Sequence, residues 1–183
     1  MPTANAPDAV ALLKADHRKV EELFEKFESA KTASQKKSLA VQICTELTVH
    51  ATIEEEIFYP ACTGQIEEKD MVGEAYVEHD GAKVLIAELT ASEPDSEFYD
   101  AKMKVLSEDI KHHVKEEERR GDGIFAQAKE AGLNLDALGT QMLERKEQLM
   151  VQIKTEGLPF PITRAFTGHK LKQGSPVELP AAR

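Results

Sequence analysis

The chain has 183 residues, a hydrophobic fraction of 41% and a formal net charge of −10, which is typical of one domain with a sizeable core. The acidic balance argues against nucleic acid or an anionic membrane as the main partner, because phosphate binding needs a basic surface. No apolar run approaches the ~20 residues of a membrane-spanning helix, and the first residues lack the pattern of a signal peptide. We therefore expect a cytoplasmic protein, in which Cys44 and Cys62 are free thiols.

Apolar residues recur at helical spacing in four long stretches of the chain. The predicted helices cover residues 7–31, 34–60, 67–91 and 95–119. We expect Pro60 to end or kink the second helix, and Pro94 to break the chain before the fourth, because proline cannot continue a helical hydrogen-bond pattern.

The C-terminal third of the chain is less regular. After the glycines at 121 and 123, a short helix is predicted at 124–131 and a fifth long helix at 136–154. Residues 157–183 hold four of the eight prolines, which indicates an irregular tail that is extended, partly disordered or wrapped around the rest.

These elements predict an all-α protein, an up-down-up-down four-helix bundle with an additional C-terminal helix and an irregular tail. The domain would span residues 1–156, with the bundle core at about 9–120 and the extra helices at 124–155. Residues 157–183 would form the proline-rich tail.

A pattern of histidine and glutamate occurs twice. A His-x3-Glu pair, preceded by a lone histidine about thirty residues upstream, is formed first by His17, His50 and Glu54 and then by His79, His113 and Glu117. Residues four apart share one face of a helix, so each pair can direct two donor atoms at one point. Four imidazoles and two carboxylates from four helices suit two transition-metal ions. The alternatives are chance spacing, or a set of core histidines that only form hydrogen bonds.

The apolar stripes decide which of several neighbouring residues faces inward. Steps of three and four back from His113 meet Ile110 and Leu106, whereas steps back from His112 meet Asp109. His113 and Glu117 are therefore predicted as ligands, and His112 is expected at a solvated rim, with a role in supporting the ligands as the alternative. By the same test Glu21 lies off the stripe, each Glu-Glu-Glu run turns one member inward, and His169 in the tail has no assigned role.

The motifs around these histidines resemble the hemerythrin-like, or HHE, family over residues 9 to 120. The resemblance is carried by DHRKVEELFEKFE, HATIEEEIFYP, VEHDGAKVLIAEL and HHVKEEE. It implies a four-helix bundle that holds a non-heme di-iron centre. It also implies that His17 and His50 bind one iron, that His79 and His113 bind the other, and that Glu54, Glu117 and an oxo or hydroxo group bridge them.

The chain departs from the oxygen-carrying members of that family, which have a second histidine one turn after the third motif and an aspartate five residues after the last histidine. Here Lys83 takes the first position, and the last carboxylate is Glu117 at four, with Glu118 at five. Ligand counting then leaves an open or solvent-filled position on both irons. Lys83 is expected to extend outward or to pair with a carboxylate. Tyr76 is expected to donate a hydrogen bond, occupy a coordination position or pack in the core.

Open positions favour the processing of a small oxidant, namely dioxygen, hydrogen peroxide or nitric oxide. Peroxide breakdown of a catalase- or peroxidase-like kind is favoured over reversible oxygen carriage. The alternative is a metal-dependent sensor or iron-binding module without catalysis, and a third hypothesis is a purely structural helical protein. Zinc and manganese suit the same ligands as iron.

Overall fold

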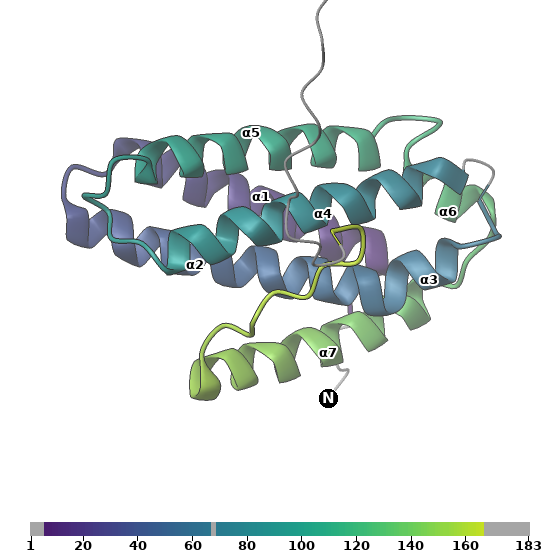
Figure 1. The fold of residues 1–183 in the computed structure, drawn as a ribbon. Coiled ribbons are helices and arrows are strands. Elements are labelled where there is room, and N and C mark those ends of the chain that lie inside the picture. The colour runs from purple at the N-terminus through teal and green to yellow at the C-terminus, as the bar shows by residue number, and fades with distance from the viewer. Residues whose placement is uncertain (1–5, 67–68, 167–183) are drawn as a thin grey trace, which may run out of the picture.

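The structure is a computed structural model that describes residues 6–66 and 69–166 (Figure 1). The described residues form helices and no strands, as the all-α prediction requires. The helices are α1 (Ala9–Ser29), α2 (Ala33–Ile53), the π-helix η1 (Glu54–Phe58), α3 (Tyr59–Cys62), α4 (Lys69–Thr90), α5 (Tyr99–Glu117), α6 (Ile124–Glu130) and α7 (Leu135–Glu156).

Side-chain caps fix where the first two helices begin. The Asp8 carboxylate accepts a hydrogen bond from the Ala11 N–H at 2.8 Å, which satisfies a backbone donor that the first turn leaves free. Thr32 and Gln35 form a reciprocal capping box at the start of α2. Helix α5 begins later than the predicted residue 95, because the Tyr99 N–H is held in a turn by the Ser96 carbonyl at 3.1 Å.

Four long helices lie side by side along the length of the molecule (Figure 1). Helix α2 contacts α1 and α4, and helix α5 also contacts α1 and α4. The four helices therefore form a closed ring, α1–α2–α4–α5, which we call the helix ring. Helix α7 packs outside the ring against α1, α2 and η1. Its close approach requires Gly139, since a Cβ atom there would clash with the backbone of Pro7.

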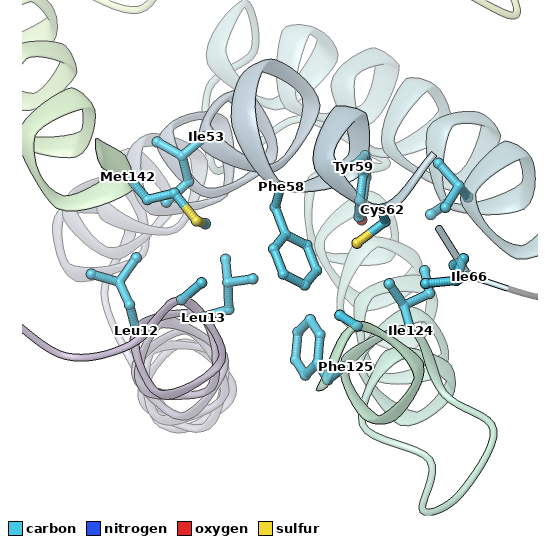
Figure 2. Packing of buried hydrophobic residues seen from close by; sticks show 14 of the residues in the cluster. Leu12, Leu13, Ile53, Phe58, Tyr59, Cys62, Ile66, Ile124, Phe125 and Met142 are labelled. Carbon is cyan, nitrogen blue, oxygen red and sulfur yellow. The ribbon is translucent and has the colours of Figure 1, made fainter. Parts of the chain in front are cut away.

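The apolar stripes of the long helices are buried in two separate clusters. Figure 2 shows the first cluster, in which Leu13, Phe58, Phe125 and Met142 pack together. The second lies further along the helix ring, and its fully buried members include Phe24, Ile43, Met103 and Leu106. On α1 and α4, one histidine falls between the residues of the two clusters, so a polar layer separates them.

The prediction that Pro60 ends or kinks the second helix is wrong in its first part. The chain stays helical to Cys62, and the change occurs earlier, at the π-helix η1. There the Tyr59 N–H donates to the Glu54 carbonyl, five residues back, which widens the turn. Pro60 then falls in the first turn of α3, where a missing N–H is tolerated.

The described part of the tail turns back over the helix ring (Figure 1). Gly157 has a φ of 85°, a conformation that favours glycine, and it ends α7. The segment that follows is fastened to α4 by Asp80, whose Oδ2 accepts the backbone N–H of Arg164 at 2.7 Å and also that of Ala165. The expectation of a wrapped tail is met for residues 157–166, and residues 167–183 lie outside the described part.

Among the described helices, none has the combination of length and apolar character that crossing a bilayer requires.

Candidate metal centre

The six residues predicted as metal ligands meet in the polar layer between the two apolar clusters. Each of them is at most 6% exposed, and they come from every member of the helix ring. They are His17 on α1, His50 on α2, Glu54 at the start of η1, His79 on α4, and His113 and Glu117 on α5.

The first half of the site joins α1 and α2. The Nε2 atoms of His17 and His50 lie 3.1 Å apart, and His50 Nε2 is 3.1 Å from Glu54 Oε2. Glu117 approaches from α5, with its Oε2 3.4 Å from His17 Nε2. Donor atoms of these four residues lie within 4.8 Å of one another, so one ion could contact all of them.

The second half joins α4 and α5 in the same way. The Nε2 atoms of His79 and His113 lie 3.2 Å apart, and His79 Nε2 is 3.4 Å from Glu54 Oε2. Glu117 Oε2 also lies 3.5 Å from His113 Nε2. Both glutamates therefore contact both halves, which is the arrangement that bridging carboxylates need.

Each of the four histidines faces a carboxylate with its other ring nitrogen. Three of these contacts are hydrogen bonds at Nδ1: His17 to Glu118 at 2.8 Å, His79 to Glu55 at 3.1 Å, and His113 to Glu78 at 2.7 Å. In the fourth, His50 Nδ1 lies 3.7 Å from Asp16 Oδ2, and Asp16 also pairs with Lys146. Such outer carboxylates fix the orientation of metal-binding imidazoles and increase their basicity.

These four contacts follow the helix ring in one direction. Asp16 on α1 serves the histidine of α2, and Glu55 of η1, which continues α2, serves the histidine of α4. Glu78 on α4 serves the histidine of α5, and Glu118, the C-cap of α5, serves the histidine of α1. We call this closed series the carboxylate ring.

The donor set fits cations. A histidine that gives its Nδ1 proton to a carboxylate, as His79 and His113 both do, presents a lone pair at Nε2, yet the Nε2 atoms of this pair face each other at 3.2 Å. Two lone pairs at that distance repel unless a proton or a metal ion lies between them. In addition, Glu54 Oε1 and Glu117 Oε2 are buried without a hydrogen-bond partner among the described residues, a costly condition that a bound cation would relieve.

The pKa shifts of the buried residues also indicate that the site favours bound positive charge. Burial alone would lower the pKa of His17, but the nearby carboxylate of Glu117 and the hydrogen bond to Glu118 raise it to about 9, which favours a protonated imidazole in the absence of metal. Burial, together with the charge of Glu117, raises the pKa of Glu54 to about 7. For Glu117, burial is outweighed by the neighbouring imidazoles, chiefly His113 and His17, and its pKa is lowered.

Tyr59 joins the site although the sequence reasoning did not select it. Its hydroxyl donates to Glu117 Oε1 at 2.8 Å and lies 3.4 Å from both Glu54 Oε2 and His79 Nε2. Burial, with the charges of Glu117 and Glu54, raises the pKa of Tyr59 well above 10, so the phenol holds its proton. Tyr76, which was the candidate, is only partly buried and packs its ring against that of Tyr59.

The outer carboxylates were also missed or misplaced. Each glutamate run was expected to turn only one member inward, but Glu55 is buried beside Glu54, and Glu118 bonds His17 while Glu117 faces the centre. One signal was available, because every outer carboxylate is adjacent in sequence to a predicted ligand. That signal gives no partner, however, since each contact crosses to another helix.

Three further expectations are confirmed. His113 is buried, whereas the His112 side chain is 63% exposed. Glu21 is off the site and pairs with Arg18. Lys83 pairs with carboxylates, since its Nζ lies 2.7 Å from Glu55 Oε1 and 3.3 Å from Asp80 Oδ1. His169 lies outside the described residues.

A cavity of about 700 Å³ adjoins the site. The four buried histidines form part of its wall, together with apolar side chains such as Ile86 and Ile110. Residues 158–162 and Arg164 of the tail line it as well. The cavity therefore offers a route to the histidines that passes the fastened tail.

The chain is similar to known proteins in sequence and in fold. The profile of the Hemerythrin HHE cation binding domain family matches residues 8–120. A protein of Nostoc sp. (strain PCC 7120 / SAG 25.82 / UTEX 2576), described as a DNA nickase, is 29% identical over 107 residues, which are 58% of this chain and 30% of that protein. The chain thus spans less than a third of that relative's length.

A solved structure has a similar fold. It is the crystal structure of a hemerythrin HHE cation binding domain-containing protein, the Rv2633c homolog from Mycobacterium kansasii, with a TM-score of 0.67. The sequences are 21% identical, and the match covers 83% of this chain and 95% of that chain.

Proposed function

This chain belongs to the hemerythrin HHE cation-binding family, and we propose that it holds two iron ions and processes a small oxidant. The observation that carries the proposal is the pair of facing imidazoles in each half of the site, at 3.1 and 3.2 Å, with Glu54 and Glu117 between the halves. His17 and His50 would hold one ion, and His79 and His113 the other. Zinc or manganese would suit the same donors, so the identity of the metal as iron is itself proposed.

When bound, the iron ions would supply a binding position for the oxidant and electrons for its reduction. The chain supplies the rest. Hydrogen bonds to the carboxylate ring hold the imidazoles of His17, His79 and His113 with Nε2 toward the centre. The Tyr59 hydroxyl donates its one proton to Glu117 Oε1 at 2.8 Å, which leaves Oη able to accept a hydrogen bond from a polar oxidant. An acceptor at this position favours hydrogen peroxide, which can donate a hydrogen bond, over reversible binding of dioxygen, which cannot; nitric oxide is the third candidate.

The proposal also covers the arrangement of the helices and the boundary of the domain. The closed contacts of the helix ring support an up-down-up-down four-helix bundle, with residues 1–156 as the domain and 157–183 as its tail. We do not extend the DNA chemistry named for the Nostoc relative to this chain. It spans 30% of that protein, and its net charge of −10 disfavours phosphate binding.

The test is anaerobic purification, followed by iron quantification and optical spectra before and after hydrogen peroxide. We expect two irons per chain, a spectral change on oxidation and measurable peroxide consumption. A metal-replete sample with one ion or none would overturn the two-iron proposal. Two irons without peroxide consumption would instead favour a metal-dependent sensor, which should show a large change of thermal stability on iron loading.

A further inference from the structure

A second donor set lies beside the buried site, on the outer face of α4 and α5. It consists of Glu78, His112 and Glu116, which directly precede the predicted ligands His79, His113 and Glu117 in sequence. We propose that these three residues form a surface site for one divalent transition-metal ion, distinct from the buried centre. The ion would be exchangeable, since the His112 side chain is 63% exposed.

The spacing of the donors supports a site rather than a chance cluster. His112 Nε2 lies 3.5 Å from Glu116 Oε1 and 3.7 Å from Glu78 Oε1. In the buried centre, the separation between His113 Nε2 and Glu117 Oε2 is 3.5 Å, so the outer set is nearly as compact. His112 and Glu116 are four residues apart on one helix face, and the third donor comes from the neighbouring helix. All three donor atoms lie within 4.8 Å of one another.

Glu78 is held in place by the buried centre. Its Oε2 accepts the Nδ1 proton of His113 at 2.7 Å, which leaves Oε1 turned toward His112. A carboxylate fixed in this way loses little side-chain freedom when it binds an ion, and this reduces the cost of forming the site. Glu78 would thus link the two sites, with one oxygen on a histidine of the buried centre and the other on the surface ion.

The surroundings favour cations. The hollow that contains the three donors is also lined by Asp70, Gly73, Glu74 and Val77. Among the residues that the structure describes, four carboxylates and one imidazole face it, and its lining includes no lysine or arginine. One nitrogen and two oxygen donors suit borderline divalent ions such as Zn²⁺, Fe²⁺ and Mn²⁺.

The position of the site suggests what it does. If the buried centre holds iron, as proposed above, an ion captured at the surface lies one carboxylate away from His113. We infer that the surface site increases the rate at which the buried centre is filled, without changing how many ions it finally holds. Only this loading role rests on the proposed function, because the surface site itself requires no metal in the interior.

The tightly held metal of the full chain is first quantified. The test is then a titration of the chain with Zn²⁺, in which binding is measured by calorimetry. We expect one additional exchangeable ion per chain, with affinity reduced on the order of tenfold or more in His112→Ala and in Glu116→Gln. Glu108→Gln is the matched control, since Glu108 lies on the same helix and pairs with Lys104 at the surface, outside the three-donor set. Tightly held metal and helicity should be unchanged in all three variants.

The loading role has its own readout, namely the rate of Fe²⁺ uptake by metal-free protein. His112→Ala should fill more slowly to the same final iron content. The surface site is overturned if no additional Zn²⁺ binds, if His112→Ala binds it as wild type does, or if Glu108→Gln weakens it equally. A normal rate of Fe²⁺ uptake in a variant that no longer binds the extra Zn²⁺ would overturn the loading role alone. A buried centre that holds no iron would overturn the proposed function, but the Zn²⁺ titration would still test the surface site.

Discussion

The Tyr59 hydroxyl donates a hydrogen bond to Glu117 Oε1 at 2.8 Å, linking the chain just after η1 to the end of α5. Both side chains are almost completely buried, so the bond forms where water cannot replace it. It leaves Glu117 Oε2 directed at His17 and His113. The tyrosine thereby determines which oxygen of Glu117 faces the histidines.

The variant Tyr59→Phe should keep two tightly held ions but lose stability in the metal-free state. Removing the hydroxyl leaves a buried carboxylate oxygen without its donor, which costs about 1–3 kcal/mol. Chemical denaturation of the metal-free protein measures the loss. Tyr76→Phe is the control, because the Tyr76 ring contacts Tyr59 and is only partly buried. An equal loss in both variants would mean that general packing, and not the bond to Glu117, is responsible.

Replacing His113 and His112 should separate the two proposed metal sites. His113→Ala removes a predicted ligand of the buried centre, so we expect at least one of two tightly held ions to be lost. His112→Ala should leave the content unchanged once a chelator has removed exchangeable metal. Elemental analysis of both purified proteins provides the measurement, and equal losses would show that burial is a poor guide to ligation here.

The carboxylate ring can be tested within one run of three glutamates. Glu55→Gln weakens the support of His79, whose Nδ1 it accepts at 3.1 Å, and such changes reduce metal affinity about 10–100-fold. Glu56→Gln is the matched control, since Glu56 pairs with Arg145 away from the centre. Competition with a chelator of known affinity gives both values. If the two variants release metal alike, overall charge matters more than the contact with His79.

The two cysteines give a pH-dependent prediction. Burial raises the pKa of Cys44 and of Cys62 to about 12, and both are free thiols. At pH 8, iodoacetamide should therefore react slowly with the native protein and quickly, at two thiols per chain, with the denatured one. Because the unfolded thiols ionise near 9 and the folded ones near 12, the free energy of unfolding should fall as the pH rises above 9. Rapid native labelling would contradict the burial of these side chains.

The spacing of the apolar residues was sufficient to predict the helices and the direction in which the main donor residues face. A stripe of apolar residues is a local property, so it predicted that His17 and His113 face inward and that His112 does not. The ends of helices depended on turn hydrogen bonds, as at Ser96 and Tyr99, and were less well predicted.

Tyr59 was not predicted as a site residue because the helical phase changes before it. Five positions after Glu54, an ordinary α-helix would turn the side chain about 140° away from the site. The π-helix η1 takes more residues per turn, and this brings the Tyr59 hydroxyl to within 3.4 Å of Glu54. The contacts of the outer carboxylates were not predicted for another reason. Each carboxylate contacts a histidine on a different helix, and only the tertiary structure brings the two together.

The carboxylate ring has a consequence for assembly. Because the series closes on itself, removing any one helix strands a carboxylate without its histidine and a histidine without its carboxylate. No three of the four helices can therefore build a smaller, self-consistent version of the centre. High-affinity metal binding should appear only in chains whose four helices have all docked, which makes the bound metal an indicator of complete folding.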